Sequence, residues 1–532
     1  MQKHTDSTLA GIVAKHALRA PERNALIFEG AGTRPDDIRT YGELWRNAQR
    51  LALGLTRLDV RPGDHIGVLM ANHAEFVELM IASGIIGAVF VPIDPRTKGS
   101  RLTHLLQSSG CTAVLAADYA LPALMEIRSQ LPQLQRIVGL ETDETAENIA
   151  GHVDVIPYHS VCSEDGDLPI AVVDPSVAME LIYTSGTTGD PKGIVMTHRR
   201  YCDTSSAALD LFGYRDDDTL YTGLSLTHAN AQIITLGAAL SRGLQCVISR
   251  RFTKKRLWDI TRKYGCTTFT LLGGMTTAIY AEPPRSDDAE NPVRFVVSAG
   301  MPAAIWQQFE HRFGLRVLEF YGAAEGGLAV NPIDEGPVGS IGKPAPSFVH
   351  QIVDESGCDV QRGAPGELLL RHADGAAFRV EYYGMPEASA KKCEGGWLHM
   401  GDVVHEDADG WLYFDHRLGS AIRRNGEFID PAVIEKAIAE SGLVDDVYVY
   451  GIAVQTSAPG EKEIVAAVVP KSGTRHDPGR VIDTCREKLP PSHVPAFIQT
   501  TQEIPKTASE KPQVRFLVEA FQRNPRSIHV AG

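Results

Sequence analysis

The sequence predicts an α/β protein with substantial parallel sheet, followed by a small α+β domain. Three observations lead to this prediction. Short apolar, β-rich runs alternate with stretches of helical periodicity through most of the chain, a pattern typical of strand–helix–strand units. The 532 residues exceed what one hydrophobic core supports, so two or more domains are expected. Near residue 418, predicted hairpins give way to a new series of a helix and strands.

Strands are predicted at several short apolar runs, and helices between them. The strand candidates are HIGVLM, CTAVLAA, QCVISR, TTFTLL and RFVVSAG. A stretch such as TYGELWRNAQRLALGLTRL begins with polar residues and then repeats apolar residues at helical spacing, which predicts an amphipathic helix. No repeat of 20–50 residues is evident.

The run FVELMIASGIIGAVFVPID, residues 76–94, is almost continuously apolar. Its length suits a membrane span. However, Glu78 lies near its start, Gly84 and Gly87 divide it, and Pro92 is close to its end. We therefore predict a buried helix, a glycine turn and a buried strand.

The last part of the chain reads as a separate unit. GWLHMGDVVHEDADGWLYFDHR predicts hairpins with Asp-Gly turns. FIDPAVIEKAIAESG then predicts a helix with Pro431 early and Gly442 at its end, and DDVYVYGIAV and EIVAAVVP predict two strands. The predicted domains are therefore 1–417 and 418–532, the second being of a size that folds independently.

Composition narrows the class of protein. The formal net charge of −14 argues against a broad nucleic-acid or anionic-membrane footprint, although it leaves room for a local basic patch. The eight cysteines show neither a CxxC pair nor a zinc-ligand spacing. This pattern indicates reduced thiols in a cytoplasmic protein. The N-terminal stretch has no long apolar core and no cleavage-site pattern, so no signal peptide is expected.

The stretch YTSGTTGDPKG, residues 183–193, gathers glycines, hydroxyl side chains and one lysine after a predicted buried strand, AMELIYT. Backbone N–H groups, hydroxyls and a lysine can together surround a phosphate, whereas the same residue types also build plain surface turns. The stretch is not a Walker P-loop, because Pro191-Lys192-Gly193 stands where Gly-Lys-Ser/Thr is needed. No GxGxxG after a strand, GxSxG or HExxH is present.

The stretch resembles the signature loop of the adenylate-forming superfamily, which includes acyl-CoA synthetases, luciferases and peptide-synthetase adenylation domains. Further resemblances follow in the family's order and cover nearly the whole chain. They are SAGMP (298–302), EFYGAAEGG (319–327), GWLHMGDV (396–403), HRLGSAIRRNGEFIDPAVIE (416–435) and IPKTASEK (504–511). The resemblance implies a large N-terminal domain of several subdomains and a small mobile C-terminal domain, with a hinge near 417–421.

The implied chemistry joins a carboxylic acid to AMP, with release of pyrophosphate, and then transfers the acyl group to a thiol. The implied cofactors and co-substrates are ATP, Mg²⁺ and CoA. Glu325 and Thr184 resemble the Mg²⁺ ligands, which suits a cation that prefers oxygen donors. Lys511 resembles the catalytic lysine, whose ammonium meets charge developing between carboxylate and α-phosphate; Lys506, five residues earlier, would be the decoy. The residues that resemble the grip on the β- and γ-phosphates are Thr184, Ser185, Gly186, Thr187, Thr188 and Lys192.

The resemblance also implies a nucleoside site and an acid pocket. Tyr321 would lie against adenine, with Gly300 and Gly322 allowing close approach of the backbone and Met301 also contacting the nucleotide. Asp402 would accept hydrogen bonds from the ribose hydroxyls, and Arg417 would reach the nucleotide. The acid pocket would be formed by His228, Asn230, Gly273 and Gly274, where the two glycines suggest room. Without the resemblance, each of these residues would be interpreted as a core, turn or surface residue.

The sequence departs from the family pattern at a few positions. Ala324 stands where a threonine usually contacts the AMP phosphate, and one lost hydrogen bond to a charged group costs ~1.5–3 kcal/mol. Gly419 replaces the usual hinge Asp or Lys, Asn425-Gly426 replaces two glycines, and Glu510 replaces a glycine before Lys511.

Three functions agree with these residues: an acid–CoA ligase, a stand-alone enzyme that loads a carrier protein or a luciferase-like oxygenase, and a non-catalytic nucleotide-binding remnant. No carrier domain follows Lys511, and Lys192, Glu325, Asp402 and Lys511 are all present, which favours the ligase. A medium-sized aliphatic or aromatic acid is the favoured substrate. The expected partners are this acid, ATP and CoA, with a possible homodimer and with neither nucleic acid nor an integral membrane segment.

Overall fold

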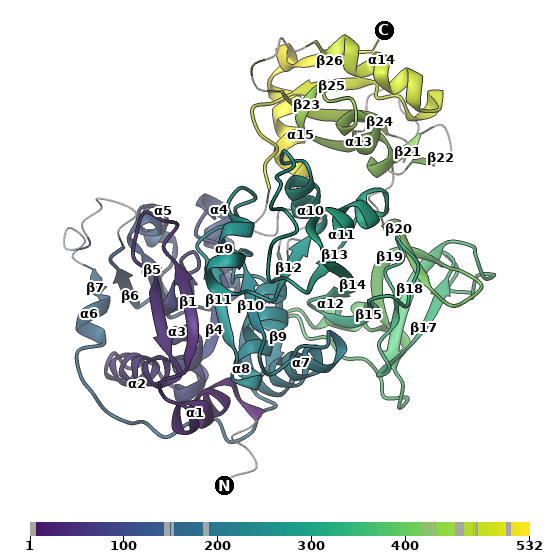
Figure 1. Cartoon of the computed structure of the whole chain (residues 1–532). Coiled ribbons are helices and arrows are strands. Elements are labelled where there is room, and N and C mark those ends of the chain that lie inside the picture. The colour runs from purple at the N-terminus through teal and green to yellow at the C-terminus, as the bar shows by residue number, and fades with distance from the viewer. Residues whose placement is uncertain are drawn as a thin grey trace. The chain divides into compact units, whose positions relative to one another are not determined.

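The computed structural model describes residues 7–142, 149, 154–184, 191–418, 422–424, 427–429, 431–452, 462–471, 473, 477–506 and 512–531. Contacts divide the chain into two compact units. The first contains the chain up to residue 349 together with 371–398, and the second contains 350–370 and the chain from 399 onward. The α/β class and the division into a larger and a smaller unit agree with the prediction (Figure 1).

Two large sheets form the first unit. The nine-stranded sheet has the order β16–β15–β14–β13–β12–β10–β11–β1–β2. All pairs from β14 to β1 are parallel, and the pairs at both edges are antiparallel. In this order, the strands are Lys343–Pro344, Gly326–Asn331, Arg316–Ala323, Phe295–Ala299, Thr268–Leu272, Thr219–Thr222, Gln245–Ser249, Asn24–Glu29 and Asp37–Thr40.

The second sheet of this unit has seven strands in the order β7–β6–β5–β3–β4–β8–β9. Every pair is parallel except β8–β9, which is an antiparallel hairpin at the edge. In this order, the strands are Val155–Pro157, Arg136–Leu140, Ala113–Ala117, His65–Leu69, Val89–Ile93, Ala178–Tyr183 and Gly193–Thr197. The five strands predicted from apolar runs are β3, β5, β11, β12 and β13, so those predictions are confirmed.

Helices cover both sheets. They are α1 (Leu9–Arg19), α2 (Tyr41–Arg57), α3 (Ala74–Ile86), α4 (Gly99–Ser108), α5 (Leu121–Glu126), α6 (Tyr158–Val161), α7 (His198–Leu211), α8 (Ala238–Arg242), α9 (Leu257–Tyr264), α10 (Gly273–Tyr280), α11 (Trp306–Phe313) and α12 (Pro386–Lys392). The predicted helix α2 begins with a capping box between Thr40 and Glu43, which satisfies backbone N–H groups of its first turn.

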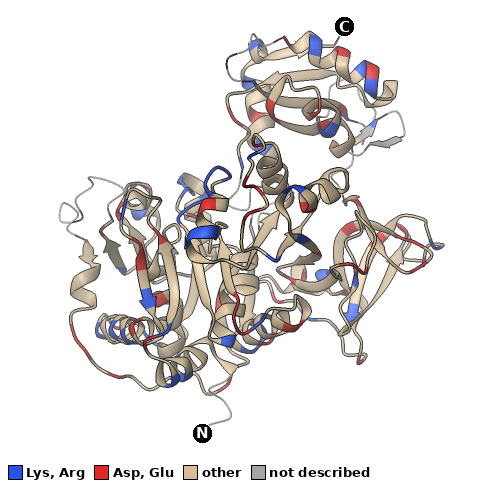
Figure 2. Cartoon of the chain, in the orientation of Figure 1, with Lys and Arg blue, Asp and Glu red and all other residues tan. Residues whose placement is uncertain are grey.

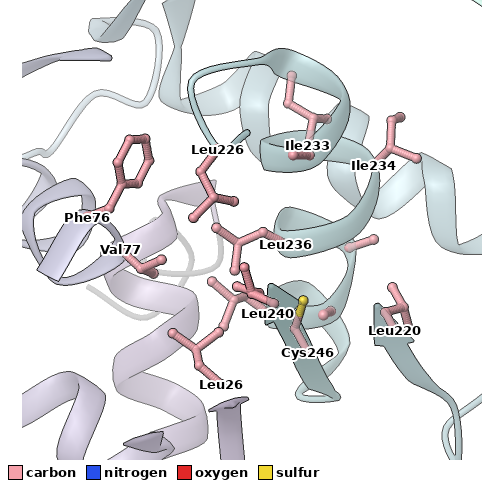
Figure 3. Close-up of a cluster of buried hydrophobic side chains, with 14 of the residues drawn as sticks. Leu26, Phe76, Val77, Leu220, Leu226, Ile233, Ile234, Leu236, Leu240 and Cys246 are labelled. Carbon is pink, nitrogen blue, oxygen red and sulfur yellow. The ribbon is translucent and has the colours of Figure 1, made fainter. Parts of the chain in front are cut away.

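The apolar run 76–94 folds as predicted. It forms most of α3, a left-handed Gly87 and β4, and both elements are almost wholly buried. None of the helices in the described part of the chain is both long and apolar enough to cross a bilayer. Figure 3 shows Phe76 and Val77 of α3 beside Leu26 of β1 and Leu236 of the helix that precedes α8, so this run serves the core of the first unit.

The second unit contains the four-stranded sheet β17–β18–β19–β20 and the C-terminal α+β fold. The first sheet consists of Phe348–Val353, Gly366–His372, Leu398–Glu406 and Leu412–Arg417, and its β19–β20 pair is the predicted hairpin. The C-terminal part has β21 (Ile422–Arg424), β22 (Glu427–Ile429), β23 (Val444–Ile452), β24 (Glu463–Pro470), β25 (Phe497–Thr500) and β26 (Ile528–Val530), with α13 (Pro431–Ala439), α14 (Pro478–Lys488) and α15 (Val514–Arg523). The predicted helix is α13 and the predicted strands are β23 and β24. Gly419 and the centre of the expected hinge lie outside the described residues.

Charge is mixed along the chain, as Figure 2 shows. The densest basic run is RRFTKKR, residues 250–256, just before α9. Three of its charges are engaged: Arg250 donates to the carbonyl of Asn72, Lys254 pairs with Glu282, and Arg256 pairs with Glu29. This local basic patch is therefore partly neutralised within the first unit.

Candidate active site

The glycine–hydroxyl stretch connects β8 to β9. Tyr183 pairs with Gly193 across this hairpin, and Thr184 N donates to Lys192 O at 3.1 Å. Both ends of the stretch are therefore fixed by the sheet, and Thr184 and Lys192 lie side by side along the backbone. This connection between antiparallel strands differs from the strand-to-helix connection of a Walker loop. The other predicted phosphate-binding residues, Ser185, Gly186, Thr187 and Thr188, lie outside the described residues.

The side chains of Lys192 and Glu325 meet at Tyr382, a residue that the sequence alone did not indicate. Tyr382 Oη donates a hydrogen bond of 2.9 Å to Glu325 Oε1. Lys192 Nζ lies 5.1 Å from the centre of the Tyr382 ring, within the range of a cation–π interaction. Lys192 directly precedes β9, and Glu325 follows β14. The structure therefore brings these two residues together through contacts with Tyr382, which is distant from both in the sequence.

A second missed residue, Arg200 of α7, holds the backbone just before Glu325. Its Nη2 donates 2.6 Å to the carbonyl oxygen of Ala324. Burial lowers the pKa of Arg200, while the nearby Glu325 carboxylate acts in the opposite direction. Ala324, the departure from the family pattern, is thus held through its backbone and not through a side-chain hydroxyl.

The predicted adenine segment is a tight turn after β13. Gly300 has φ +95°, which favours glycine, and the amides of Gly300 and Met301 both donate to the carboxylate of Glu319 on β14. Burial raises the pKa of Glu319 to about 8, against the effect of these amide bonds. Tyr321 follows two positions later on the same strand and is half-buried. Because alternate residues share a face, Glu319 and Tyr321 point to the same side of β14.

Two glycines of this region have different surroundings. A Cβ added at Gly273 would lie 2.4 Å from the carbonyl oxygen of Gly300, whereas one at Gly274 would meet nothing within 4 Å. The room expected at Gly273 is therefore filled by the turn after β13, and the absence of a side chain there allows close approach of two backbones. Gly322 also lies close to the backbone of Gly327, since a Cβ added at Gly322 would lie 2.9 Å from Gly327 O.

The other predicted pocket residues lie at the start of an unusual helix. His228 and Asn230 are half-buried. The helix η5 from Asn230 to Gly237 has π-type hydrogen bonding. Such helices are rare in proteins, and those that occur often lie at functional sites. Among the described residues, Asn230 Oδ1 is a buried atom without a hydrogen-bond partner. Buried polar atoms are normally satisfied, so this oxygen is a candidate contact for a bound molecule.

In the second unit, Asp402 and Arg417 stand opposite each other on β19 and β20. Glu367 on β18 supports them: its carboxylate accepts from Gly401 N at 3.2 Å and contacts His399 Nδ1 at 3.2 Å. Asp402 is therefore placed by a fixed backbone at a buried position.

Lys511 lies outside the described residues. Lys506, expected to be the decoy, forms an ion pair with Asp446, with Nζ 2.5 Å from Oδ2. The ammonium of Lys506 therefore forms an ion pair within the second unit.

Magnesium would be held by few protein ligands. No group of three or more His, Cys, Asp or Glu side chains suited to a metal occurs among the residues that the structure describes. Thr184 and Glu325 offer oxygen donors, and Mg²⁺ is often bound by one or two carboxylates together with substrate phosphates and water. The residues present therefore fit a Mg²⁺ ion that arrives with ATP.

Comparison with known proteins decides the family. The family model described as AMP-binding enzyme matches residues 13–377, and the model described as AMP-binding enzyme C-terminal domain matches residues 433–511. The chain belongs to the AMP-binding enzyme family. The predicted membership of the adenylate-forming superfamily is thereby confirmed.

Relatives of this AMP-binding enzyme support its place in the CoA-ligase branch. It is 30% identical over 459 residues to a medium/long-chain-fatty-acid–CoA ligase of Mycobacterium marinum, covering 86% of each chain. It is 28% identical over 499 residues to a crotonobetaine/carnitine–CoA ligase of Salmonella heidelberg, covering 92% of this chain and 95% of the relative.

The fold of the AMP-binding enzyme is also similar to solved structures. An anthranilate CoA ligase in complex with anthranoyl-AMP superposes with a TM-score of 0.82 at 23% identity, covering 97% of both chains. A benzoate CoA ligase from Burkholderia xenovorans gives a TM-score of 0.79 at 20% identity, covering 96% of this chain and 99% of that one. At 23% and 20% identity, these similarities establish the shared fold.

Proposed function

We propose that this AMP-binding enzyme is an ATP-dependent acid–CoA ligase that acts on a medium-sized aliphatic or aromatic carboxylic acid. The observation that carries the proposal is the convergence of Lys192 and Glu325 on the buried Tyr382, with Thr184 hydrogen-bonded through its backbone to Lys192. A cation, a carboxylate and a hydroxyl grouped in this way suit the phosphates of Mg-ATP.

In the first step, the acid's carboxylate attacks the α-phosphorus of ATP, the bond to the β-phosphate oxygen breaks, and pyrophosphate leaves. Lys192 and the stretch that it ends bind the β- and γ-phosphates, and Glu325 with Thr184 provides oxygen ligands for Mg²⁺. Bound Mg²⁺ supplies neutralisation of charge on the phosphate oxygens. Lys511 brings its ammonium to the oxygens that gain charge.

The residues implied by the family resemblance would hold the nucleoside. Tyr321 and the turn at Gly300 and Met301 receive adenine, with Gly322 allowing close approach, and Asp402 accepts hydrogen bonds from the ribose hydroxyls, with Arg417 beside it. In the second step, the CoA thiolate attacks the acyl carbonyl, the thioester forms, and AMP leaves. A hinge near 417–421, between domains 1–417 and 418–532, would present a different face of the C-terminal domain for this step.

The proposed acid class draws on the candidate pocket. Space at Gly274 and the unpartnered Oδ1 of Asn230 suit an acid with one polar group, and His228 stands at the pocket wall. The relatives' names cover fatty, carnitine-type and aryl acids, a range that supports a medium-sized acid without selecting one.

The test is release of pyrophosphate with Mg-ATP across a panel of carboxylic acids, with and without CoA. Lys511→Ala should abolish release, and Lys506→Ala is the matched control because Lys506 is paired with Asp446. Release that requires one acid and gives a thioester only with CoA would support the ligase. Release without a thioester would indicate an enzyme that loads a carrier protein. ATP binding without release from any acid would indicate a non-catalytic remnant.

A further inference from the structure

Tyr382 belongs to a segment that runs beside the start of β9. Val195 N donates to Glu381 O at 2.9 Å, and Tyr383 N donates to Gly193 O at 2.8 Å. The amide of Tyr382 itself donates 2.8 Å to Ser389 Oγ, and Tyr382 is only 5% exposed. These bonds fix the backbone of Tyr382 on both sides, so its ring has little freedom to move.

The ring presents two different contacts to two oppositely charged groups. The hydroxyl donates to Glu325 Oε1 at 2.9 Å, and the ring lies 5.1 Å from Lys192 Nζ. Tyrosine suits this position because an aromatic ring attracts a cation while a phenol donates a hydrogen bond to a carboxylate. Phenylalanine would keep only the ring contact with Lys192, and an aliphatic residue would keep neither contact.

We propose that Tyr382 is the positioning residue of the Mg-ATP site: it orients Glu325 for the metal through its hydroxyl and holds Lys192 for the phosphates through its ring. This inference rests on the proposed function and adds to it a residue that acts through its neighbours. The hydrogen bond engages Glu325 Oε1, and Oε2 would be the oxygen that this carboxylate offers to Mg²⁺.

Arg200 restrains the backbone directly before Glu325. It fixes the Ala324 carbonyl by a hydrogen bond of 2.6 Å, so the glutamate is restrained at its backbone by Arg200 and at its side chain by Tyr382. A carboxylate held in this way loses less rotational freedom when it binds a metal. Removing the Tyr382 hydroxyl should therefore weaken metal binding more than nucleotide binding.

The experiment uses the full-length protein and three variants. Tyr382→Phe removes the hydroxyl, Tyr382→Leu removes the ring as well, and Tyr383→Phe is the matched control, because Tyr383 is 40% exposed and its ring lies against His65. Mn²⁺ bound in the presence of ATP is measured by electron paramagnetic resonance. The Mg²⁺ concentration for half-maximal pyrophosphate release and the KM for ATP are measured in parallel.

We expect Tyr382→Phe to weaken Mn²⁺ binding and to raise the half-maximal Mg²⁺ concentration about tenfold, as loss of one hydrogen bond to a charged group implies. Its KM for ATP at saturating Mg²⁺ and its melting temperature should stay close to those of the wild type. Tyr382→Leu should also raise the KM for ATP. Tyr383→Phe should change neither Mn²⁺ binding nor the KM for ATP. Unchanged Mn²⁺ binding in folded Tyr382→Phe, or an equal change in Tyr383→Phe, would overturn the inference.

The Mn²⁺ measurement separates this inference from the proposed function. If the wild type binds Mn²⁺ with ATP but releases no pyrophosphate with any acid, the ligase proposal fails and the role of Tyr382 is still decided by the variants. If pyrophosphate is released normally and Tyr382→Phe binds Mn²⁺ as the wild type does, only the positioning role fails.

Discussion

Asp402 and Arg417 occupy paired positions on β19 and β20, and Arg417 Nε lies 3.6 Å from Asp402 Oδ1. This separation is long for a hydrogen bond between the two atoms, although it is within the range of an ion pair. The backbone beside Asp402 is held by Glu367. The sheet therefore fixes the position of this carboxylate, which the proposed contact with the ribose hydroxyls needs.

Replacing Asp402 with asparagine should weaken nucleotide binding. The substitution keeps the shape and removes the charge, so the hydrogen bonds to the ribose lose about 1.5–3 kcal/mol. We expect the KM for ATP to rise about 10- to 100-fold, with a smaller change in kcat. Asp409→Asn, in the exposed turn of the same hairpin, is the control. An equal KM for the two variants would remove Asp402 from the nucleotide site.

Gly273→Ala and Gly274→Ala form a matched pair of adjacent substitutions. The first places a methyl group 2.4 Å from Gly300 O, while the second meets nothing within 4 Å. Forcing the turn after β13 to shift costs about 1–3 kcal/mol, so Gly273→Ala should lower the free energy of unfolding and raise the KM for ATP. Gly274→Ala should leave both unchanged and alter the KM for the acid. Urea unfolding and steady-state kinetics measure these effects, and similar behaviour of the two variants would contradict the expectation.

Much of this architecture follows from local sequence. Strands such as β3 and β12 are short apolar runs, and α3 followed by β4 could be predicted because Gly87 and Pro92 interrupt a long apolar stretch. Local sequence did not indicate contacts between distant segments. The parallel register that pairs Leu272 with Ala299 places Gly273 against Gly300, and only that register shows that Gly273 serves backbone packing.

The same limit applies to the candidate site. Lys192 and Glu325 could be predicted from motifs that resemble a family, but Tyr382 and Arg200 could not, because a lone tyrosine and a helix arginine carry no local signal. Their roles arise from pairing of the segment around residue 382 with β9 and from the packing of α7 near the end of β14.

Ala324→Thr should increase the rate of adenylation. Arg200 already fixes the carbonyl of residue 324, so a new hydroxyl would be added to a restrained backbone. One hydrogen bond to a phosphate contributes about 1.5–3 kcal/mol, and we expect kcat/KM for pyrophosphate release to rise about tenfold. Ala323→Thr, at the neighbouring half-buried position, should not reproduce the gain. A lower rate in Ala324→Thr would mean that alanine is needed at this position.

Glu180→Gln should change how stability depends on pH. Glu180 on β8 is fully buried, and its oxygens have no hydrogen-bond partner within the described chain. Burial raises the pKa of Glu180 from 4.5 to about 8, while Gln232 and Arg200 act in the opposite direction. Between these two pH values the folded protein keeps a proton that the unfolded chain has lost.

The sign follows from this difference in bound protons. Because the unfolded state binds fewer protons between about pH 4.5 and pH 8, the free energy of unfolding falls as pH rises, by about 1.4 kcal/mol per pH unit at most. Glutamine does not ionise, so Glu180→Gln should remove this contribution. The free energy of unfolding of the variant, relative to that of the wild type, should therefore be higher at pH 8 than at pH 5. Urea unfolding at pH 5, 6, 7 and 8, with the exposed Glu355→Gln as control, measures the difference. Parallel pH curves for wild type and Glu180→Gln would show that Glu180 ionises in the folded protein as readily as in the unfolded chain.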